Sequence, residues 1–208
     1  MSGHSKKEEK MEYGENTERH TGPAKRRIEN ALVELLRKDR FDHITVTAIC
    51  RQAHTSRITF YTYFADKYVL LDEYFKSMTD TALRTFWDMQ QENNKNSDSI
   101  QSWCNFLDAI LGLNTEYGDI LSRSEANGDP YLYFCFHRKV LYNVEQFTKK
   151  YCASLKPKYP VEQISRLLCD GIWGFIDESR SLHIPETEIR REAEDSLRIM
   201  LSSRLFAK

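Results

Sequence analysis

The side chains between residues 57 and 64 carry groups that suit contacts with nucleic acid. A helix that turns about 100° per residue places Phe60 and Phe64 on one face, because they are four residues apart. The other positions hold an arginine, an isoleucine and a series of hydroxyls. Hydroxyl and guanidinium groups bond phosphate oxygens or base edges, and an exposed isoleucine packs on a thymine methyl group. The pattern predicts a helix that lies in a DNA groove, with its phenylalanines in a core.

Short elements around this helix must position it. Thr45 is expected to cap a helix over 46–53, and Ser56 is expected to cap the helix over 57–64. His54 and Thr55 form the turn between them. Asp66 caps a longer helix that follows. An earlier helix is predicted by apolar residues spaced three and four apart: Ile28, Ala31, Leu32, Leu35 and Leu36.

The rest of the chain also favours helices. We expect them at 99–113, 116–124, 130–153, 161–183 and 186–205, separated by breaks rich in Gly, Pro, Asn and Ser. No stretch alternates with period two for long enough to predict a sheet, so the fold class is all-α. The expected organisation is a disordered arm at 1–22, a helix-turn-helix domain at 23–67 and a helical body at 68–208.

Composition limits the classes of function. The net charge is -1, yet residues 24–67 hold nine Lys and Arg against five Asp and Glu, while the later residues are net acidic. No apolar run is long enough for a membrane span or a signal peptide, so we expect a cytoplasmic protein without a membrane partner. The five cysteines are scattered and set among apolar residues, which indicates reduced, buried thiols.

Residues 24–71 resemble the DNA-binding region of the TetR family of bacterial transcriptional regulators. The resemblance lies in the Thr-Val start of the second helix at 45–46, the apolar spacing of 49–53 and the Thr-Phe-Tyr-Thr-Tyr-Phe run at 59–64. Lys67 and the pair Leu70-Leu71 also match. The resemblance implies a three-helix head followed by a ligand-binding and dimerisation body. It implies DNA contacts by these residues: Thr47, Arg57, Ile58, Thr59, Tyr61, Thr62, Tyr63 and Lys67.

The chain departs from the family pattern at the turn. His54 stands where the family usually has glycine, at a position where the backbone φ is often positive. Ile58 replaces a residue that is typically small, and the sequence 38–40 lacks the glycine usual near the end of the first helix. These changes bear on DNA affinity and operator preference, and they leave the predicted fold intact.

Two apolar stripes late in the chain suit either a dimer interface or an intramolecular core. They are formed by Ile164, Leu167, Leu168, Gly171, Ile172 and Phe175, and by Ile189, Ala193, Leu197, Met200 and Leu201. The aromatic middle of the chain suits either an effector pocket or ordinary core. The candidate ligand-binding residues are Trp103, Phe106, Phe134, His137 and Arg138. No catalytic motif, cofactor motif or metal-ligand spacing is found, so we expect no enzyme, cofactor or metal site.

The resemblance implies a ligand-responsive homodimer that binds a double-stranded DNA operator, most often as a repressor released by a small-molecule effector. The alternative is a co-regulator that keeps the fold and acts through protein–protein contacts without binding DNA. His54, Ile58 and the modest charge of the head motivate this alternative.

Overall fold

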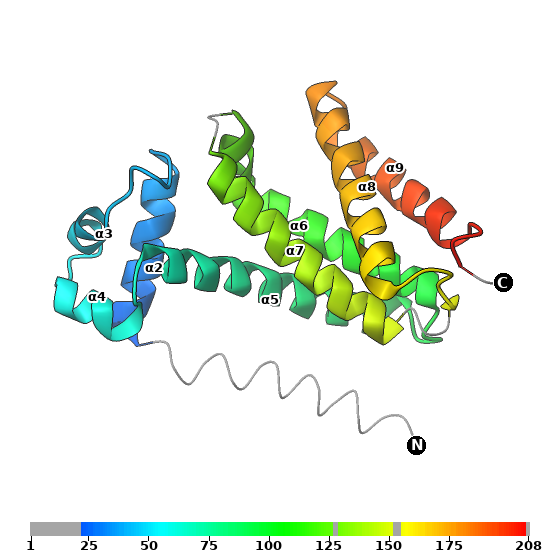
Figure 1. Cartoon of the computed structure of the whole chain (residues 1–208), viewed down its shortest axis with the longest axis horizontal. Coiled ribbons are helices and arrows are strands. Elements are labelled where there is room, and N and C mark those ends of the chain that lie inside the picture. The colour runs from blue at the N-terminus through cyan, green and yellow to red at the C-terminus, as the bar shows by residue number, and fades with distance from the viewer. Residues whose placement is uncertain (1–21, 127–128, 152–154, 207–208) are drawn as a thin grey trace, which may run out of the picture. The chain divides into compact units, whose positions relative to one another are not determined.

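The computed structural model describes residues 22–126, 129–151 and 155–206. Every named element in these ranges is an α-helix, which confirms the all-α fold class (Figure 1). The predicted arm at 1–22 lies outside the described residues except for Gly22. No described helix is long and apolar enough to cross a membrane. The helices are α2 (Pro23–Leu36), α3 (Val46–Gln52), α4 (Arg57–Tyr63), α5 (Lys67–Asn93), α6 (Ser99–Ala126), α7 (Pro130–Tyr151), α8 (Val161–Ser181) and α9 (Glu186–Leu201).

The chain divides into two compact units, each of which is described by itself. The first unit comprises the described part of Met1–Phe75 together with Asp119–Tyr133. The second unit comprises Lys76–Gly118 and the described part of Phe134–Lys208. The division therefore falls within α5, whereas the sequence analysis expects a boundary after residue 67.

In the first unit α2, α3 and α4 pack together around a small apolar core (Figure 1). The predicted caps are present: the Thr45 hydroxyl accepts the N–H of Ala48 at 3.1 Å, and the Ser56 hydroxyl accepts the N–H of Thr59 at 3.0 Å. Each cap satisfies a donor that the first turn of its helix leaves unpaired. The fully buried side chains of this core include Ile28, Leu32, Phe41, Ile49, Phe60, Phe64, Leu70 and Leu71.

The turn between α3 and α4 has a positive φ at His54, as the family pattern implies. The φ of His54 is 49°. The N–H of His54 donates to the carbonyl of Arg51 at 3.2 Å, and the N–H of Thr55 donates to the carbonyl of Cys50 at 3.0 Å. These two bonds form the motif in which a left-handed residue closes a helix and satisfies its last carbonyls. The turn therefore keeps its geometry with histidine in place of glycine.

A second segment of the chain joins the first unit through Asp129. This carboxylate is buried and accepts the N–H of Phe41 at 2.7 Å and the N–H of Leu132 at 3.1 Å. The ring of Phe41 stacks on Tyr131 with centroids 5.5 Å apart. Hydrogen bonds to an ionised acceptor are stronger than neutral ones, so Asp129 fixes the turn after α2 against the start of α7.

The second unit contains α8 and α9, which lie side by side (Figure 1). Ile164, Leu168 and Ile172 of α8 are buried, and so are Ile189 and Ala193 of α9. Much of the two predicted apolar stripes is thus intramolecular core. The thiols of Cys104 and Cys169 in this unit, like that of Cys50 in the first, are free and buried; Cys135 is free and half-buried, and Cys152 lies outside the described residues.

One predicted break is wrong. The sequence predicts separate helices over 99–113 and 116–124, but α6 runs continuously from Ser99 to Ala126. The predicted break rests on Gly118. A glycine inside a helix costs only about 1 kcal/mol relative to alanine, and it ends a helix only when the surrounding structure provides no continuation. Packing along a long helix outweighs that local cost.

Candidate nucleic-acid interface

The helix α4 divides into a buried and an exposed face as its sequence predicts. Phe60 and Phe64 are fully buried, with 0% and 1% of their surfaces exposed. Ile58 is 82% exposed, and Arg57 and Thr62 are exposed beside it. An isoleucine left in water loses about 1.5 to 3 kcal/mol of burial energy that a core position would give. The exposed face of α4 is therefore not explained by the packing of this chain.

Two hydroxyls on α4 already make local hydrogen bonds. The Thr59 hydroxyl lies 2.9 Å from that of Ser56, within the cap of the helix, and Thr59 is half-buried. The Thr62 hydroxyl donates to the carbonyl of Ile58 at 3.0 Å. A hydroxyl has one donor and two acceptor positions, so the Thr62 oxygen remains able to accept from an external donor. Thr47, on the first turn of α3, is also exposed.

Arg57 and Tyr61 form a pair on the surface of α4. The Arg57 guanidinium donates to the Tyr61 hydroxyl at 3.3 Å, and it lies 5.9 Å from the centre of the Tyr61 ring. Both side chains are exposed. A guanidinium has five donors, so one bond to Tyr61 leaves the others for an external acceptor such as a phosphate or a guanine edge.

Tyr63 lies elsewhere than predicted. The resemblance implies that it contacts DNA, but Tyr63 is half-buried, and its hydroxyl lies beside Gly22 at the start of α2. A Cβ atom added at Gly22 would lie 3.0 Å from the Tyr63 hydroxyl oxygen, which is tighter than side chains normally approach. Tyr63 therefore packs α4 against α2, and its position depends on a glycine at residue 22.

Lys67 is used inside the first unit. Its ammonium donates to the carbonyls of Phe41 at 2.8 Å, Asp42 at 3.1 Å and Ile44 at 2.7 Å. It also lies 4.6 Å from the centre of the Phe41 ring. Burial lowers the pKa of Lys67, and the nearby carboxylates of Asp42 and Asp129 oppose that shift. An ammonium has three donors, so this geometry leaves none for the phosphate contact that the resemblance implies.

The exposed face of α3 and α4 carries no carboxylate. Between Asp42 and Asp66 the sequence contains no Asp or Glu, while Arg51 and Arg57 contribute positive charge. Arg51 is exposed in the last turn of α3, beside His54. Arg51 is not among the DNA contacts predicted from the sequence, although the sequence shows that no acidic residue lies near it. A surface of cations and hydroxyls suits the phosphate backbone of DNA.

The five candidate ligand residues of the body do not form one site. Trp103 and Phe106 are buried and pack on Phe147 of α7, with centroids 4.9 and 4.4 Å from that ring. Phe134 is 55% exposed and lies under the guanidinium of Arg138. Phe147 and Arg138 both lie on α7, and about 13.5 Å along the helix axis separates them. Four of the five residues are thus split between an aromatic core and a surface pair, and the fifth, His137, lies beside Asp170 and the ring of Trp173.

The aromatic core contains one polar atom, the indole nitrogen of Trp103, whose hydrogen bonding needs explanation. The indole nitrogen of Trp103 is buried and has no hydrogen-bond partner among the residues that the structure describes. Burying an N–H donor without a partner costs about 1 to 3 kcal/mol. The Trp103 ring packs on Phe106 and Phe147, and Phe86 also packs on Phe147. An acceptor on a bound molecule or a water would remove this cost.

Comparisons with known proteins identify the fold. No protein-family model matches the sequence, and no curated protein is similar to it. A solved structure from Syntrophomonas wolfei str. Goettingen, described as a TetR-family transcriptional regulator, superposes with a TM-score of 0.67 at 13% identity, covering 88% of this chain and 96% of that one. A TetR-family structure from Shewanella sp. PV-4 gives 0.57 at 14% identity, covering 90% and 100%. A transcriptional regulator from Aquifex aeolicus VF5 gives 0.51 at 17% identity, covering 85% and 99%.

The chain therefore has the fold of the TetR-family transcriptional regulators. The similarity to these structures extends over most of the chain, well beyond the motif at 24–71. The resemblance drawn from the sequence is confirmed at the level of the fold. Function has to be argued from the residues that the fold positions.

Proposed function

We propose that this chain is a DNA-binding transcriptional regulator that contacts operator DNA through the exposed face of α3 and α4. The observation that carries the proposal is the composition of that face. Its exposed Arg51, Arg57, Thr62 and Ile58 lie on a helix-turn-helix whose 43–65 stretch holds no carboxylate. A second helix of such a motif enters the major groove and meets base edges with its first residues.

The side chains of α4 divide into different roles in this proposal. Arg57, at the first position of the helix, reads a guanine edge or binds a phosphate with the donors that its bond to Tyr61 leaves free. Ile58 packs on a thymine methyl group, and Thr47 and Thr62 bond phosphate oxygens. Thr59 stays within the cap and contributes to helix geometry.

Three of the residues selected from the sequence have smaller direct roles. Tyr61 holds the guanidinium of Arg57, and Tyr63 sets the position of α4 against α2. Lys67 fixes the turn at 41–44 with its three hydrogen bonds. We propose that Tyr63 and Lys67 position the DNA-contacting helix and do not touch DNA.

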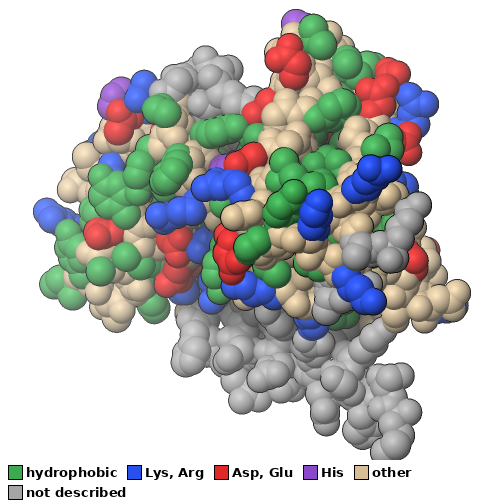
Figure 2. Space-filling view, turned by 45° about the vertical axis from the view of Figure 1, so that its right-hand side comes forward, with side chains coloured by type: hydrophobic (Ala, Val, Ile, Leu, Met, Phe, Trp, Pro, Cys, Tyr) green, Lys and Arg blue, Asp and Glu red, His purple; other side chains and the backbone are tan. Residues whose placement is uncertain are grey.

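A homodimer is part of the proposal, because two recognition helices must lie about one DNA turn apart to bind a palindrome. Leu167, Gly171 and Gly174 form an exposed stripe on α8, and a Cβ added at Gly174 would meet nothing within 4 Å. Small residues on such a stripe allow a second helix to approach closely. Figure 2 shows one face of the molecule, on which hydrophobic side chains lie exposed among charged ones. The α8 stripe is our candidate for the dimer contact.

The regulatory part of the proposal is release by a small molecule. The buried indole N–H of Trp103 within an aromatic cluster supports an apolar effector that carries one hydrogen-bond acceptor. Such a ligand would favour a conformation of the dimer in which the two heads no longer fit the operator. Repression follows if the operator overlaps a promoter.

The test is DNA binding by the full chain. Sequences are first selected from a random pool, and affinity is then measured by fluorescence anisotropy over a series of salt concentrations. We expect a selected palindrome and an affinity that falls steeply with salt. Arg57→Ala should weaken binding by about 5- to 150-fold, the equivalent of about 1 to 3 kcal/mol.

Arg191→Ala is the matched control, because Arg191 is an exposed helical arginine on α9 of the second unit. It should leave affinity unchanged. Equal losses for Arg57 and Arg191, or no binding that depends on sequence, would overturn the proposal. Absent DNA binding by a folded dimer would instead favour a co-regulator that acts through protein contacts. A Leu167→Glu variant tests the dimer separately by light scattering.

A further inference from the structure

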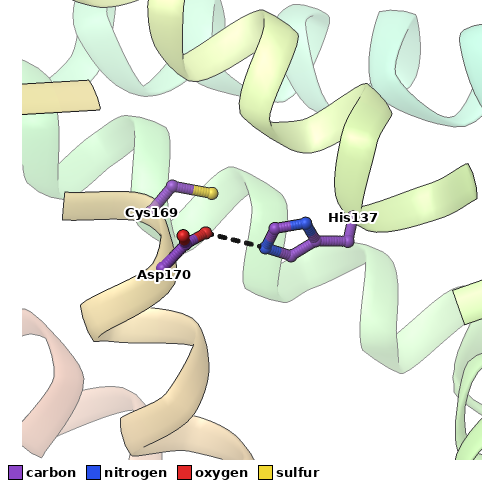
Figure 3. A group of neighbouring side chains, drawn as sticks. All are labelled: His137, Cys169 and Asp170. Carbon is purple, nitrogen blue, oxygen red and sulfur yellow. Dashed lines mark ion pairs between the residues drawn. The ribbon is translucent and has the colours of Figure 1, made fainter. Parts of the chain in front are cut away.

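Three potential metal ligands converge between α7 and α8. They are a ring nitrogen of His137, Sγ of Cys169 and a carboxylate oxygen of Asp170, and all three atoms lie within 4.8 Å of one another (Figure 3). Figure 3 shows the Cys169 and Asp170 side chains both directed from α8 toward the His137 ring. All three residues belong to the second unit. No metal site is expected from the sequence, in which no metal-ligand spacing is found.

We propose that His137, Cys169 and Asp170 form a binding site for a divalent transition metal ion, with Zn²⁺ as the best match. Imidazole nitrogen, thiolate sulfur and carboxylate oxygen are the ligands that Zn²⁺ takes in proteins. Hard cations such as Mg²⁺ and Ca²⁺ prefer ligand sets made only of oxygen, so the sulfur and nitrogen disfavour them. Three protein ligands leave a fourth position for water or another small ligand.

The distances are close to what a tetrahedral ion requires. Metal–ligand bonds of about 2.0 to 2.3 Å place neighbouring ligand atoms about 3.3 to 3.6 Å apart. Nε2 of His137 is 3.1 Å from Oδ1 of Asp170, so these two atoms need almost no movement. The other separations, at most 4.8 Å, close by about 1 Å through side-chain rotation. The ring of Trp173 meets His137 edge-on at 4.9 Å and restricts its orientation.

Burial differs among the three ligands in a way that suits an ion entering from solvent. The Cys169 residue is 7% exposed, whereas the side chains of His137 and Asp170 are 18% and 45% exposed. Asp170 also lies 3.5 Å from the guanidinium of Arg166, which the ion would have to displace or share. Only a thiolate is a metal ligand, so metal binding forms a metal–sulfur bond at Cys169 and releases the thiol proton to solvent.

The site would link α7 to α8 within the second unit. An ion that binds the folded chain and not the unfolded chain raises stability in proportion to the logarithm of its concentration over its dissociation constant. The inference does not depend on DNA binding, because every ligand lies in the second unit and the exposed face of α3 and α4 lies in the first.

The test is a titration of the reduced, full-length chain with Co²⁺, which takes the place of Zn²⁺ and absorbs light when bound by sulfur. We expect one Co²⁺ per chain with a sulfur-to-cobalt charge-transfer band, and displacement of that band by Zn²⁺. Cys169→Ser should abolish the band. Asp170→Asn should keep it and weaken binding by at least about tenfold, because even changes around the ligands cost about 10- to 100-fold.

Cys104→Ser is the matched control, since Cys104 is also a buried thiol of the second unit. It should retain both the band and the affinity. Circular dichroism shows whether each variant is folded. If Cys169→Ser does not fold, the affinity of Asp170→Asn for Co²⁺ is the test of the site. The proposal is overturned if the unmodified chain binds no Co²⁺, if Cys169→Ser keeps the band, or if Asp170→Asn binds as tightly as the unmodified chain.

Discussion

Replacing His54 by glycine tests whether the turn of the helix-turn-helix is strained. His54 is exposed and has a φ of 49°, and its N–H and that of Thr55 bond the carbonyls of Arg51 and Cys50. This φ lies in the left-handed region, where the Cβ of an L-residue crowds its own backbone. Glycine has no Cβ and would keep the same two hydrogen bonds. We therefore expect His54→Gly to stabilise the first unit.

The magnitude follows from two opposing terms. Removing the Cβ relieves about 1 to 2 kcal/mol of left-handed strain. Glycine also gives the unfolded chain more freedom, which costs about 0.4 to 1 kcal/mol. These terms leave a net gain in the free energy of unfolding of about 0 to 1.6 kcal/mol, with a central value of about 0.8 kcal/mol. His54→Ala keeps the Cβ, so it should give no gain.

The molecule offers a matched second site for this experiment. His183 ends α8 with a φ of 60°, and it makes the same pair of bonds, from its own N–H to Arg180 and from the N–H of Ile184 to Ser179. His183→Gly should therefore give a similar gain in the second unit. The assay is urea unfolding followed by circular dichroism at one fixed protein concentration. The reasoning is refuted if alanine stabilises as much as glycine, or if His54→Gly lowers the midpoint.

Four further substitutions test other parts of the structure. Phe60→Ala should cost about 3 to 5 kcal/mol of unfolding free energy because the ring is fully buried, whereas Ile58→Ala, at an 82% exposed position, should change it by less than about 0.5 kcal/mol in urea unfolding. Lys67→Met should cost about 1.5 to 3 kcal/mol through loss of hydrogen bonds to the 41–44 turn; an unchanged urea midpoint would contradict that role. Burial raises the pKa of the Asp80 carboxyl, so its ionised form opposes folding above that pKa. Asp80→Asn should therefore stabilise the chain at neutral pH, with a gain that disappears as acid protonates Asp80; thermal unfolding at several pH values checks this, and a gain that grows in acid would contradict it.

The local parts of the fold were predictable from the sequence. The caps at Thr45 and Ser56 and the burial of Phe60 and Phe64 follow from residue type and helical spacing alone. The positive φ at His54 followed from the family resemblance. The continuous helix α6 was missed because a single glycine is a weak signal beside the packing of a long helix.

The candidate DNA-contacting set was predictable only in part. Exposure of Arg57, Ile58 and Thr62 follows from the helical period. The contacts of Lys67 and Tyr63 could not be predicted in this way, because their partners are distant in the sequence. Lys67 bonds carbonyls of the 41–44 turn, and Tyr63 lies against Gly22 at the start of α2. A residue type shows which bonds a side chain can make, and only its surroundings decide which of them are made.

The sequence by itself determined that this chain forms helices, where the short helix α4 lies and which of its faces is buried. Those properties depend on neighbours within one or two turns of helix. Tertiary structure alone decided that the predicted ligand residues separate, and that His137 meets Cys169 and Asp170. The physical reason is the same for both: side chains on different helices meet only when those helices pack together, and the register between the helices sets which side chains meet.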